Sequence, residues 1–302
     1  MPRTTFNELL DAGVHFGHLK RKWNPNMAPY IFMERNGIHI IDLYKTMAKI
    51  EEAAAALRQI ARSGKRILFV ATKKQAKEIV AQHVKKVGMP FVTERWPGGM
   101  LTNFATIRKA VRKMSAIDKM MKTNTFKNMS KRERLQITRE RAKLEKQLGS
   151  IADLNRLPSA LFIVDINKEH IAVAEAKKLN IPTFAIVDTN SNPNNVDFPI
   201  PSNDDASKAI DLIVKIMVQA IEEGLSERKM DRDKRVVEEE HEVESVTGSD
   251  EDIVDATETL KEEKTSEKDT EVKAKTATDE SHPSDEKPRT RRPRKVVSKT
   301  TK

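Results

Sequence analysis

The run Arg-Ile-Leu-Phe-Val-Ala at residues 66–71 decides the fold class of this sequence. Its apolar residues follow one another without the polar alternation of a half-exposed strand, which predicts a strand covered by helices on both faces. The runs Ala-Leu-Phe-Ile-Val at 160–164 and Thr-Phe-Ala-Ile-Val at 183–187 have the same character. Shorter candidate strands occupy residues 38–41, 90–92 and 198–200.

Amphipathic helices are predicted between these strands, because apolar residues recur there every three or four positions. Thr72 is a favourable N-cap for one helix, and another helix is expected to end near Asn180, before Ile181-Pro182. The last helix is expected to begin after Ser202 or Asn203 and to end at Gly224, because glycine commonly ends helices. Repeated strand–helix–strand units predict an α/β fold, with a parallel sheet and helices on both faces.

Residues 103–150 interrupt this alternation, because they contain no candidate strand. Two narrow apolar stripes flank a polar turn, and Ser130 with Glu133 makes a capping box at the start of the second stripe. This pattern predicts an antiparallel helical hairpin, paired as a coiled coil, that protrudes from the sheet domain. Residues 104–148 carry fourteen Lys and Arg against four Asp and Glu, so the predicted arm has a net charge of +10.

Charge and composition change near residue 230. The whole chain has a formal net charge of +10, but residues 1–230 carry +15 and residues 231–302 carry −5. The second part contains no aromatic residue and too little apolar surface to offset the entropy of ordering, which predicts disorder. The predicted parts are an α/β domain (1–102 and 151–228), an inserted basic helical hairpin (103–150) and a disordered charged tail (229–302).

Composition and missing motifs argue against several protein classes. No stretch approaches the roughly 20 apolar residues of a membrane-spanning helix, and the first residues lack the apolar core of a signal peptide. The absence of cysteine rules out disulfides and thiolate zinc sites and fits a reduced cytoplasm. No glycine-rich phosphate loop follows a strand, which argues against a nucleotide site. The basic excess instead favours a polyanionic partner.

Two segments place cations beside a tryptophan, a pairing used on RNA outside regular duplex. The candidate RNA-binding residues are Lys20, Arg21, Lys22 and Trp23 in the first segment, Arg95 and Trp96 in the second, and Arg108, Lys109, Arg112 and Lys113 on the predicted arm. Structural alternatives remain open for both tryptophans. Trp23 can be a core residue beside a solvated charge run, and Trp96 can pack under the root of the hairpin.

Polar residues just beyond the strand ends suggest a second kind of site, because open α/β sheets bind ligands there. The candidate ligands for a divalent metal are Asp165, His170, Asp188 and Asp205. The same residue types can perform acid–base chemistry, so a metal-dependent hydrolase is an alternative. For each residue taken alone, a structural role is the favoured explanation, namely helix capping by Asp165 and loop hydrogen bonding by Asp188. His15 and His18 have no third ligand nearby in the sequence. We therefore expect no catalytic residue and no required cofactor, with a structural or adventitious metal left open.

Several of these segments together closely resemble the bacterial small-subunit ribosomal protein S2 family. The resemblance is carried by Gly13–Phe32, Arg95–Asn103, Asp165–Ala176 and Ile181–Ala206, and it runs collinearly through about residues 4–225. It implies a flavodoxin-like sheet with a protruding helical hairpin. It also implies a place between the head and body of the small subunit, on small-subunit ribosomal RNA. The implied protein partners are neighbouring small-subunit proteins, including the large mRNA-binding protein S1 where it is present.

Two features depart from that family. Pro97 stands where many relatives have leucine, and the tail of 72 residues is longer than usual. A membrane-surface protein is a further alternative, but it needs a wide apolar helix face, whereas the predicted arm has a narrow one. We therefore expect a cytoplasmic, non-enzymatic component of the small ribosomal subunit. We expect it to bind ribosomal RNA, to support translation and to have no membrane partner.

Overall fold

Five parallel strands form the central sheet of the structure, a computed structural model that describes residues 3–247. The strands are β4 (Ile67–Val70), β5 (Phe91–Val92), β6 (Ala160–Val164), β7 (Thr183–Val187) and β8 (Phe198–Pro201). Their order across the sheet is β5-β4-β6-β7-β8, and every neighbouring pair is parallel. In chain order this is the flavodoxin-like arrangement 2-1-3-4-5. The predicted fold class is confirmed.

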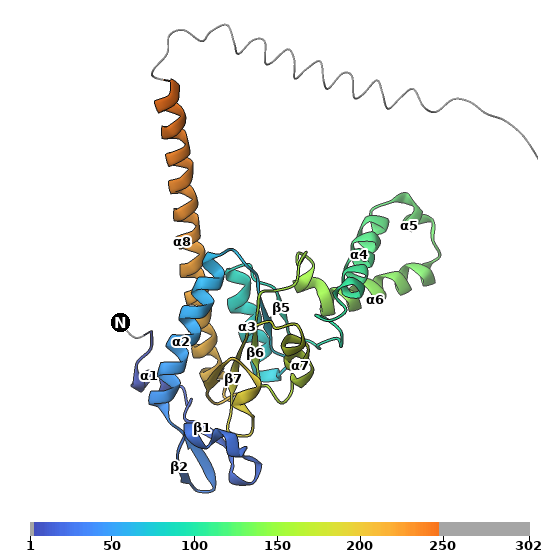
Figure 1. Ribbon diagram of the computed structural model, residues 1–302. Coiled ribbons are helices and arrows are strands. Elements are labelled where there is room, and N and C mark those ends of the chain that lie inside the picture. The colour runs from blue at the N-terminus through green and yellow to red at the C-terminus, as the bar shows by residue number, and fades with distance from the viewer. Residues whose placement is uncertain (1–2, 248–302) are drawn as a thin grey trace, which may run out of the picture. The chain divides into compact units, whose positions relative to one another are not determined.

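Helices cover both faces of this sheet, as Figure 1 shows. One face packs against α2 (Leu43–Arg62), α3 (Lys74–Lys86) and α8 (Ser207–Thr247), and the other against α7 (His170–Lys178). Successive strand residues point to opposite faces. In β4, Ile67 and Phe69 therefore join the first buried cluster, whereas Leu68 and Val70 join the second. A strand buried on both faces needs the continuous apolar run from which it was predicted.

A second, antiparallel sheet was missed by the sequence prediction. It consists of β1 (Phe16–Leu19), β2 (Ile31–Arg35) and β3 (Ile38–Ile41), in the order β1-β3-β2. We expected residues 38–41 to join the parallel sheet, but they form a strand of this antiparallel sheet instead. Asn36 and Gly37 have φ values of 53° and 75°. Two positive φ angles are typical of the tight turn of a β-hairpin, and the Asn-Gly pair was the overlooked signal. Helix α1 (Phe6–Asp11) and the 3-10 helices η1 (Lys20–Lys22) and η2 (Pro25–Tyr30) complete this region.

Two long helices replace strands in the middle of the chain. They are α4 (Phe104–Met121) and α6 (Lys131–Leu148), with the short α5 (Asn124–Asn128) between them. The two long helices contact each other, and α5 lies at the end of the pair away from the sheet (Figure 1). Val111 and Leu148 belong to the same buried cluster as α7, so the base of the pair is part of the domain core. The protruding coiled coil and the three-part division of the chain stay predictions.

The last helix continues past Gly224, where the sequence predicted its end. Helix α8 extends to Thr247, so residues 229–247, assigned to the charged tail, are helical. A Cβ atom at Gly224 would overlap the carbonyl oxygen of Arg58 and lie 3.1 Å from the Cβ of Ala61. Glycine is therefore needed because α2 and α8 approach closely, and not because a helix ends there. The predicted disorder of residues 248–302 lies outside the described residues.

One predicted cap is wrong and one helix end is confirmed. The N-cap of α3 is Lys73, whose side chain makes no capping hydrogen bond, whereas the Thr72 hydroxyl donates to Glu169. Asn180 has a φ of 52° just after α7, where the sequence placed the end of that helix. Within residues 3–247, no helix is long and apolar enough to cross a membrane.

Candidate nucleic-acid interface and a buried polar cluster

The cationic turn predicted from the sequence lies at the surface. Lys20, Arg21 and Lys22 form η1, and all three are exposed. The Nζ atom of Lys20 lies 2.7 Å from Oε2 of Glu34. No carboxylate in the described part of the chain lies within ion-pair distance of Arg21 or Lys22. Two of the three predicted cations therefore present unpaired charge.

Trp23 follows this turn directly, and its side chain is partly buried and partly exposed. Its side chain is 37% exposed. The other part of the ring packs against His39, with ring centroids 5.2 Å apart and the planes tilted by 44°. The next backbone N–H, that of Asn24, donates to the carbonyl oxygen of Thr189 over 2.8 Å. The exposed ring is thus held on a fixed backbone.

Trp96 has the structural role that the sequence left open. It is only 6% exposed, and its indole Nε1 donates to Oε1 of Glu175 over 3.2 Å. The same carboxylate accepts backbone hydrogen bonds from Gly99 (2.7 Å), Leu101 (2.9 Å) and Thr102 (3.1 Å). Burial alone would raise the pKa of Glu175, but these hydrogen bonds outweigh it and lower that pKa. Buried in this way, Trp96 cannot offer a face to RNA, so we leave it out of the candidate interface.

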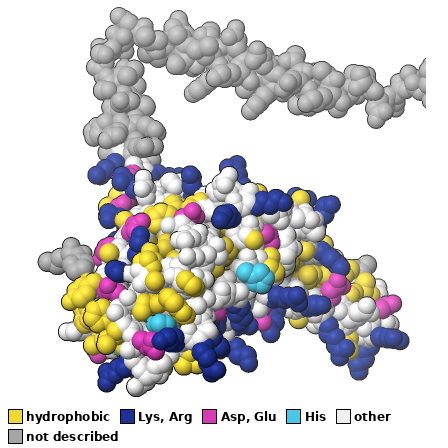
Figure 2. All heavy atoms as spheres, turned by 60° about the horizontal axis from the view of Figure 1, so that its bottom comes forward, with side chains coloured by type: hydrophobic (Ala, Val, Ile, Leu, Met, Phe, Trp, Pro, Cys, Tyr) yellow, Lys and Arg dark blue, Asp and Glu magenta, His cyan; other side chains and the backbone are white. Residues whose placement is uncertain are grey.

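The segment α4–α6 concentrates unpaired positive charge. Ten of the fourteen Lys and Arg in residues 104–148 are exposed and have no ion-pair partner among the described residues. They are Lys109, Arg112, Lys119, Lys122, Lys127, Lys131, Arg132, Arg134, Arg139 and Lys143. All four acidic residues of this segment have partners. Arg141 pairs with Asp118 and Glu145, and Lys113 pairs with Glu140. Glu133 accepts the backbone N–H of the N-cap residue Ser130 in the capping box of α6. Figure 2 shows Lys and Arg side chains crowded at this end of the molecule.

The individual residues predicted on the arm differ in availability. Lys109 and Arg112 are exposed and unpaired within residues 3–247. Arg108 instead donates from Nη1 to the carbonyl oxygen of Leu154 over 3.0 Å, and Lys113 is paired with Glu140. Lys109 and Arg112 therefore remain the strongest candidates on α4. Arg95, in the loop before α4, is also exposed.

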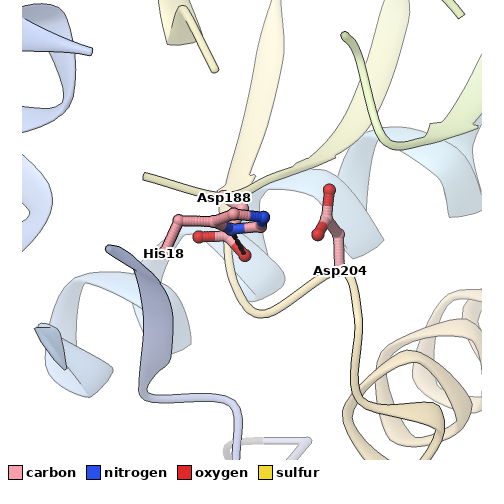
Figure 3. A group of neighbouring side chains, drawn as sticks. All are labelled: His18, Asp188 and Asp204. Atoms are coloured by element: carbon pink, nitrogen blue, oxygen red, sulfur yellow. Dashed lines mark ion pairs between the residues drawn. The ribbon is translucent and has the colours of Figure 1, made fainter. Parts of the chain in front are cut away.

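A buried polar cluster forms where three distant segments meet (Figure 3). His18 comes from β1, Asp188 follows β7, and Asp204 precedes α8. His18 Nδ1 lies 2.8 Å from Oδ2 of Asp188, and one ligand atom of each residue lies within 4.8 Å of the others. Asp188 and Asp204 are 1% and 0% exposed, and Oδ2 of Asp204 has no hydrogen-bond partner in the described structure.

The charges around this cluster are only partly balanced. Lys73 Nζ lies 2.8 Å from Oδ1 of Asp204 and 2.6 Å from Oδ1 of Asp205. Burial, together with the charge of Asp188, nevertheless raises the pKa of Asp204 to about 7. The hydrogen bond to Asp188 raises the pKa of His18. Imidazole nitrogen and carboxylate oxygen are donors that Zn²⁺ accepts, so the residues present fit a divalent cation.

The predicted ligand set is corrected by this geometry. His170 is exposed at the start of α7, with Nδ1 3.2 Å from the carbonyl oxygen of Asn167. In residues 3–247 the three-ligand geometry is met by His18, Asp188 and Asp204, and His170 has no part in it. Asp165 Oδ1 accepts the backbone N–H of Lys168 over 3.1 Å in the turn before α7, but the N-cap of α7 is Glu169, so the predicted helix capping by Asp165 is wrong.

The sequence could not select His18, because its partners come from the other half of the domain. Of the predicted ligands, Asp188 lies in the cluster and Asp205 borders it, with Oδ2 3.4 Å from His18 Nε2. The hydrolase set of Asp165, His170 and Asp188 is not assembled in the part of the chain that the structure describes.

The chain is similar to known proteins of the small ribosomal subunit. The family model described as "Ribosomal protein S2" matches residues 9–224. The small ribosomal subunit protein uS2 of Parabacteroides distasonis is 68% identical over 232 residues, which cover 77% of this chain and 84% of that protein. The uS2 proteins of Porphyromonas gingivalis and Flavobacterium johnsoniae are 70% and 68% identical over 232 residues, covering 83% and 91% of their own lengths.

A flavodoxin-like domain with an exposed surface of unpaired cations is typical of a protein that has a polyanionic partner. The match shows the family: this chain belongs to the ribosomal protein S2 family. It is accordingly a structural component of the small ribosomal subunit that serves translation, and not an enzyme. As a ribosomal protein it works in the cytoplasm, within the ribosome.

Proposed function

We propose that this chain binds small-subunit ribosomal RNA through two surfaces, the η1 turn and the exposed cations of α4–α6. The observation that carries the proposal is the set of ten exposed and unpaired cations on the arm. Lys and Arg that contact phosphates release condensed counterions, which supplies much of the affinity for nucleic acid. A cation without an ion-pair partner can do so without first breaking a salt bridge.

The experiment compares two doubly neutralised variants of the full chain. Lys109→Gln with Arg112→Gln removes two exposed cations of α4, and Lys177→Gln with Lys178→Gln removes two exposed cations of α7 as the matched control. RNA affinity is measured over a series of salt concentrations. Each lost phosphate contact should reduce the log–log salt slope by about 0.7–0.9, so the α4 variant should lose roughly 1.5. Equal slopes for the two variants would remove α4 from the interface.

We also propose that the chain docks neighbouring small-subunit proteins, including the large mRNA-binding protein S1 where that protein is present. Phe16, Phe32 and Tyr44 are 50%, 71% and 73% exposed, and all lie in the first part of the chain. Contiguous exposed apolar patches often mark protein–protein contacts, so this part of the chain is the first to test for one. Crosslinking from Phe32, replaced by a photoreactive amino acid, tests the contact in assembled small subunits. Labelling of RNA alone would contradict it.

A second binding capacity is favoured by one observation, the unpartnered and fully buried Oδ2 of Asp204. A buried carboxylate oxygen without a partner is costly, and a divalent cation would satisfy it. His18, Asp188 and Asp204 would hold the ion, with Asp205 beside them. Such an ion would tie β1 to the loops after β7 and β8, which is a structural role.

A further inference from the structure

The exposed ring of Trp23 belongs to a preorganised segment. Its own backbone N–H donates to the carbonyl oxygen of Lys20 over 3.4 Å, which closes η1. On the other side, Asn24 is bonded to Thr189, and Asn26 Nδ2 donates to Oδ1 of Asn192 over 3.1 Å. The ring is therefore presented by a backbone fixed at both ends. Little conformational entropy remains to be lost when a ligand covers it.

Only part of the Trp23 ring packs against the rest of the protein. His39, from the neighbouring strand β3, packs against it and is itself 7% exposed. Neither ring nitrogen of His39 has a hydrogen-bond partner in the described structure, so its contact with Trp23 is aromatic packing and not a polar link. Trp23 thus keeps 37% of its surface exposed while the rest of the ring contacts a buried aromatic side chain. This is the arrangement of a stacking platform.

The arm lacks such a surface. Residues 104–148 contain no Trp, Tyr or His, and their two aromatic residues, Phe104 and Phe126, are partly buried. Lys and Arg are otherwise its dominant side chains, with fourteen positions. The arm can neutralise phosphates but has little with which to stack on a base. The two proposed RNA surfaces therefore differ in chemistry, since only the η1 turn joins unpaired cations to an aromatic platform.

We infer that Trp23 stacks on an unpaired base of the RNA, with Arg21 and Lys22 on the phosphates beside it, while α4–α6 contacts phosphates alone. The inference rests on the proposed RNA binding and assigns the class of RNA that each surface recognises. Bases within an A-form duplex have both faces covered by their neighbours, so a protein ring can stack only on a base outside the helix. Stacking of this kind tolerates any base, because every base has a π-face.

The test uses two RNA probes that differ in one pairing. The first is a blunt duplex that carries a single unpaired adenosine on one strand. The second has the same strand with an opposing uridine, so that the adenosine is paired. Trp23→Ala should weaken binding of the bulged probe by roughly 5- to 150-fold, which corresponds to the loss of one base–aromatic stack. Affinity for the paired probe should change by less than about twofold, and Trp23→Phe should restore most of the lost affinity.

Fluorescence gives an independent readout, because the chain contains only two tryptophans. Trp96 is buried and hydrogen-bonded to Glu175, so the emission lost in Trp23→Phe isolates the exposed ring. The bulged probe should quench that component, and the paired probe should leave it unchanged. If Trp23→Ala weakened the binding of both probes equally, the stacking assignment would be overturned. The same conclusion would follow if the bulged probe did not quench the Trp23 emission. If the unaltered chain bound neither probe with salt dependence, the proposed RNA binding itself would fail, which is a different result.

Discussion

The indole Nε1 of Trp96 donates to Oε1 of Glu175 over 3.2 Å, and this hydrogen bond attaches the loop before α4 to helix α7. The other oxygen of the carboxylate accepts the backbone N–H groups of Leu101 and Thr102 at 2.9 and 3.1 Å. One buried side chain thus satisfies several backbone donors that have no strand or helix partner. Helix α4 begins directly after this loop, so Glu175 positions the start of α4 relative to α7.

Glu175→Gln should destabilise the domain by about 1–3 kcal/mol near neutral pH, because an amide cannot accept from all of these donors as a carboxylate does. The free energy of unfolding, measured in urea, gives the comparison. Glu222→Gln is the control, since Glu222 is exposed on α8. A loss no larger than that of the control would mean that the loop is held by apolar packing alone.

The same variant has a predictable pH dependence. Because hydrogen bonding holds the folded pKa of Glu175 below its ordinary value, the carboxylate contributes full stability above the unfolded pKa. That contribution is lost as the pH falls through the lower, folded pKa. The difference in unfolding free energy between the unaltered chain and the Glu175→Gln variant should therefore shrink in acid below about pH 4. A difference that widens in acid would reverse the assigned sign.

Gly224→Ala tests the close approach of α2 and α8. In an exposed helix this change should stabilise by about 1 kcal/mol, because alanine has the higher helix propensity. Here the added Cβ would overlap the carbonyl oxygen of Arg58, so we expect destabilisation of about 1–3 kcal/mol. Gly149→Ala is the matched control, since a Cβ there meets only Glu145 Cγ at an ordinary 3.5 Å. Thermal melts that rank both variants as stabilised would show that the helices are not in such close contact.

Neutralising Arg21 and Lys22 together should reduce the log–log salt slope of RNA binding by roughly 1.5. Lys20→Gln alone should change it less, because Lys20 is already paired with Glu34 at 2.7 Å. Filter binding over a salt series measures both. A larger effect from Lys20 than from the other two would mean that the ion pair opens when RNA binds.

Adding Zn²⁺ should raise the melting temperature of the unaltered chain, and a chelator should reverse the rise, because a ligand that binds only the folded state stabilises it. Asp204→Asn should abolish the effect, since it replaces the buried carboxylate that has an unpartnered oxygen. His170→Ala should retain it, because His170 lies outside the cluster. An equal rise in all three proteins would indicate binding elsewhere.

Local sequence patterns were sufficient for the parallel sheet. The runs at 160–164 and 183–187 coincide with β6 and β7, because a strand buried on both faces must be apolar at every position. The same reasoning failed for residues 38–41, which are equally apolar but pair with β2 across the Asn36-Gly37 turn. A short apolar run specifies a strand without specifying its neighbours.

The sequence by itself determined the order of the main elements and the concentration of charge in residues 104–148, because both depend on residues close together in the chain. Only the tertiary structure decided what single residues do. It buried Trp96 on Glu175 and left part of Trp23 exposed, although both tryptophans follow a cation in the sequence. It also brought His18, and not His170, to Asp188. These outcomes depend on contacts between segments far apart, and such contacts leave no periodic pattern in the chain.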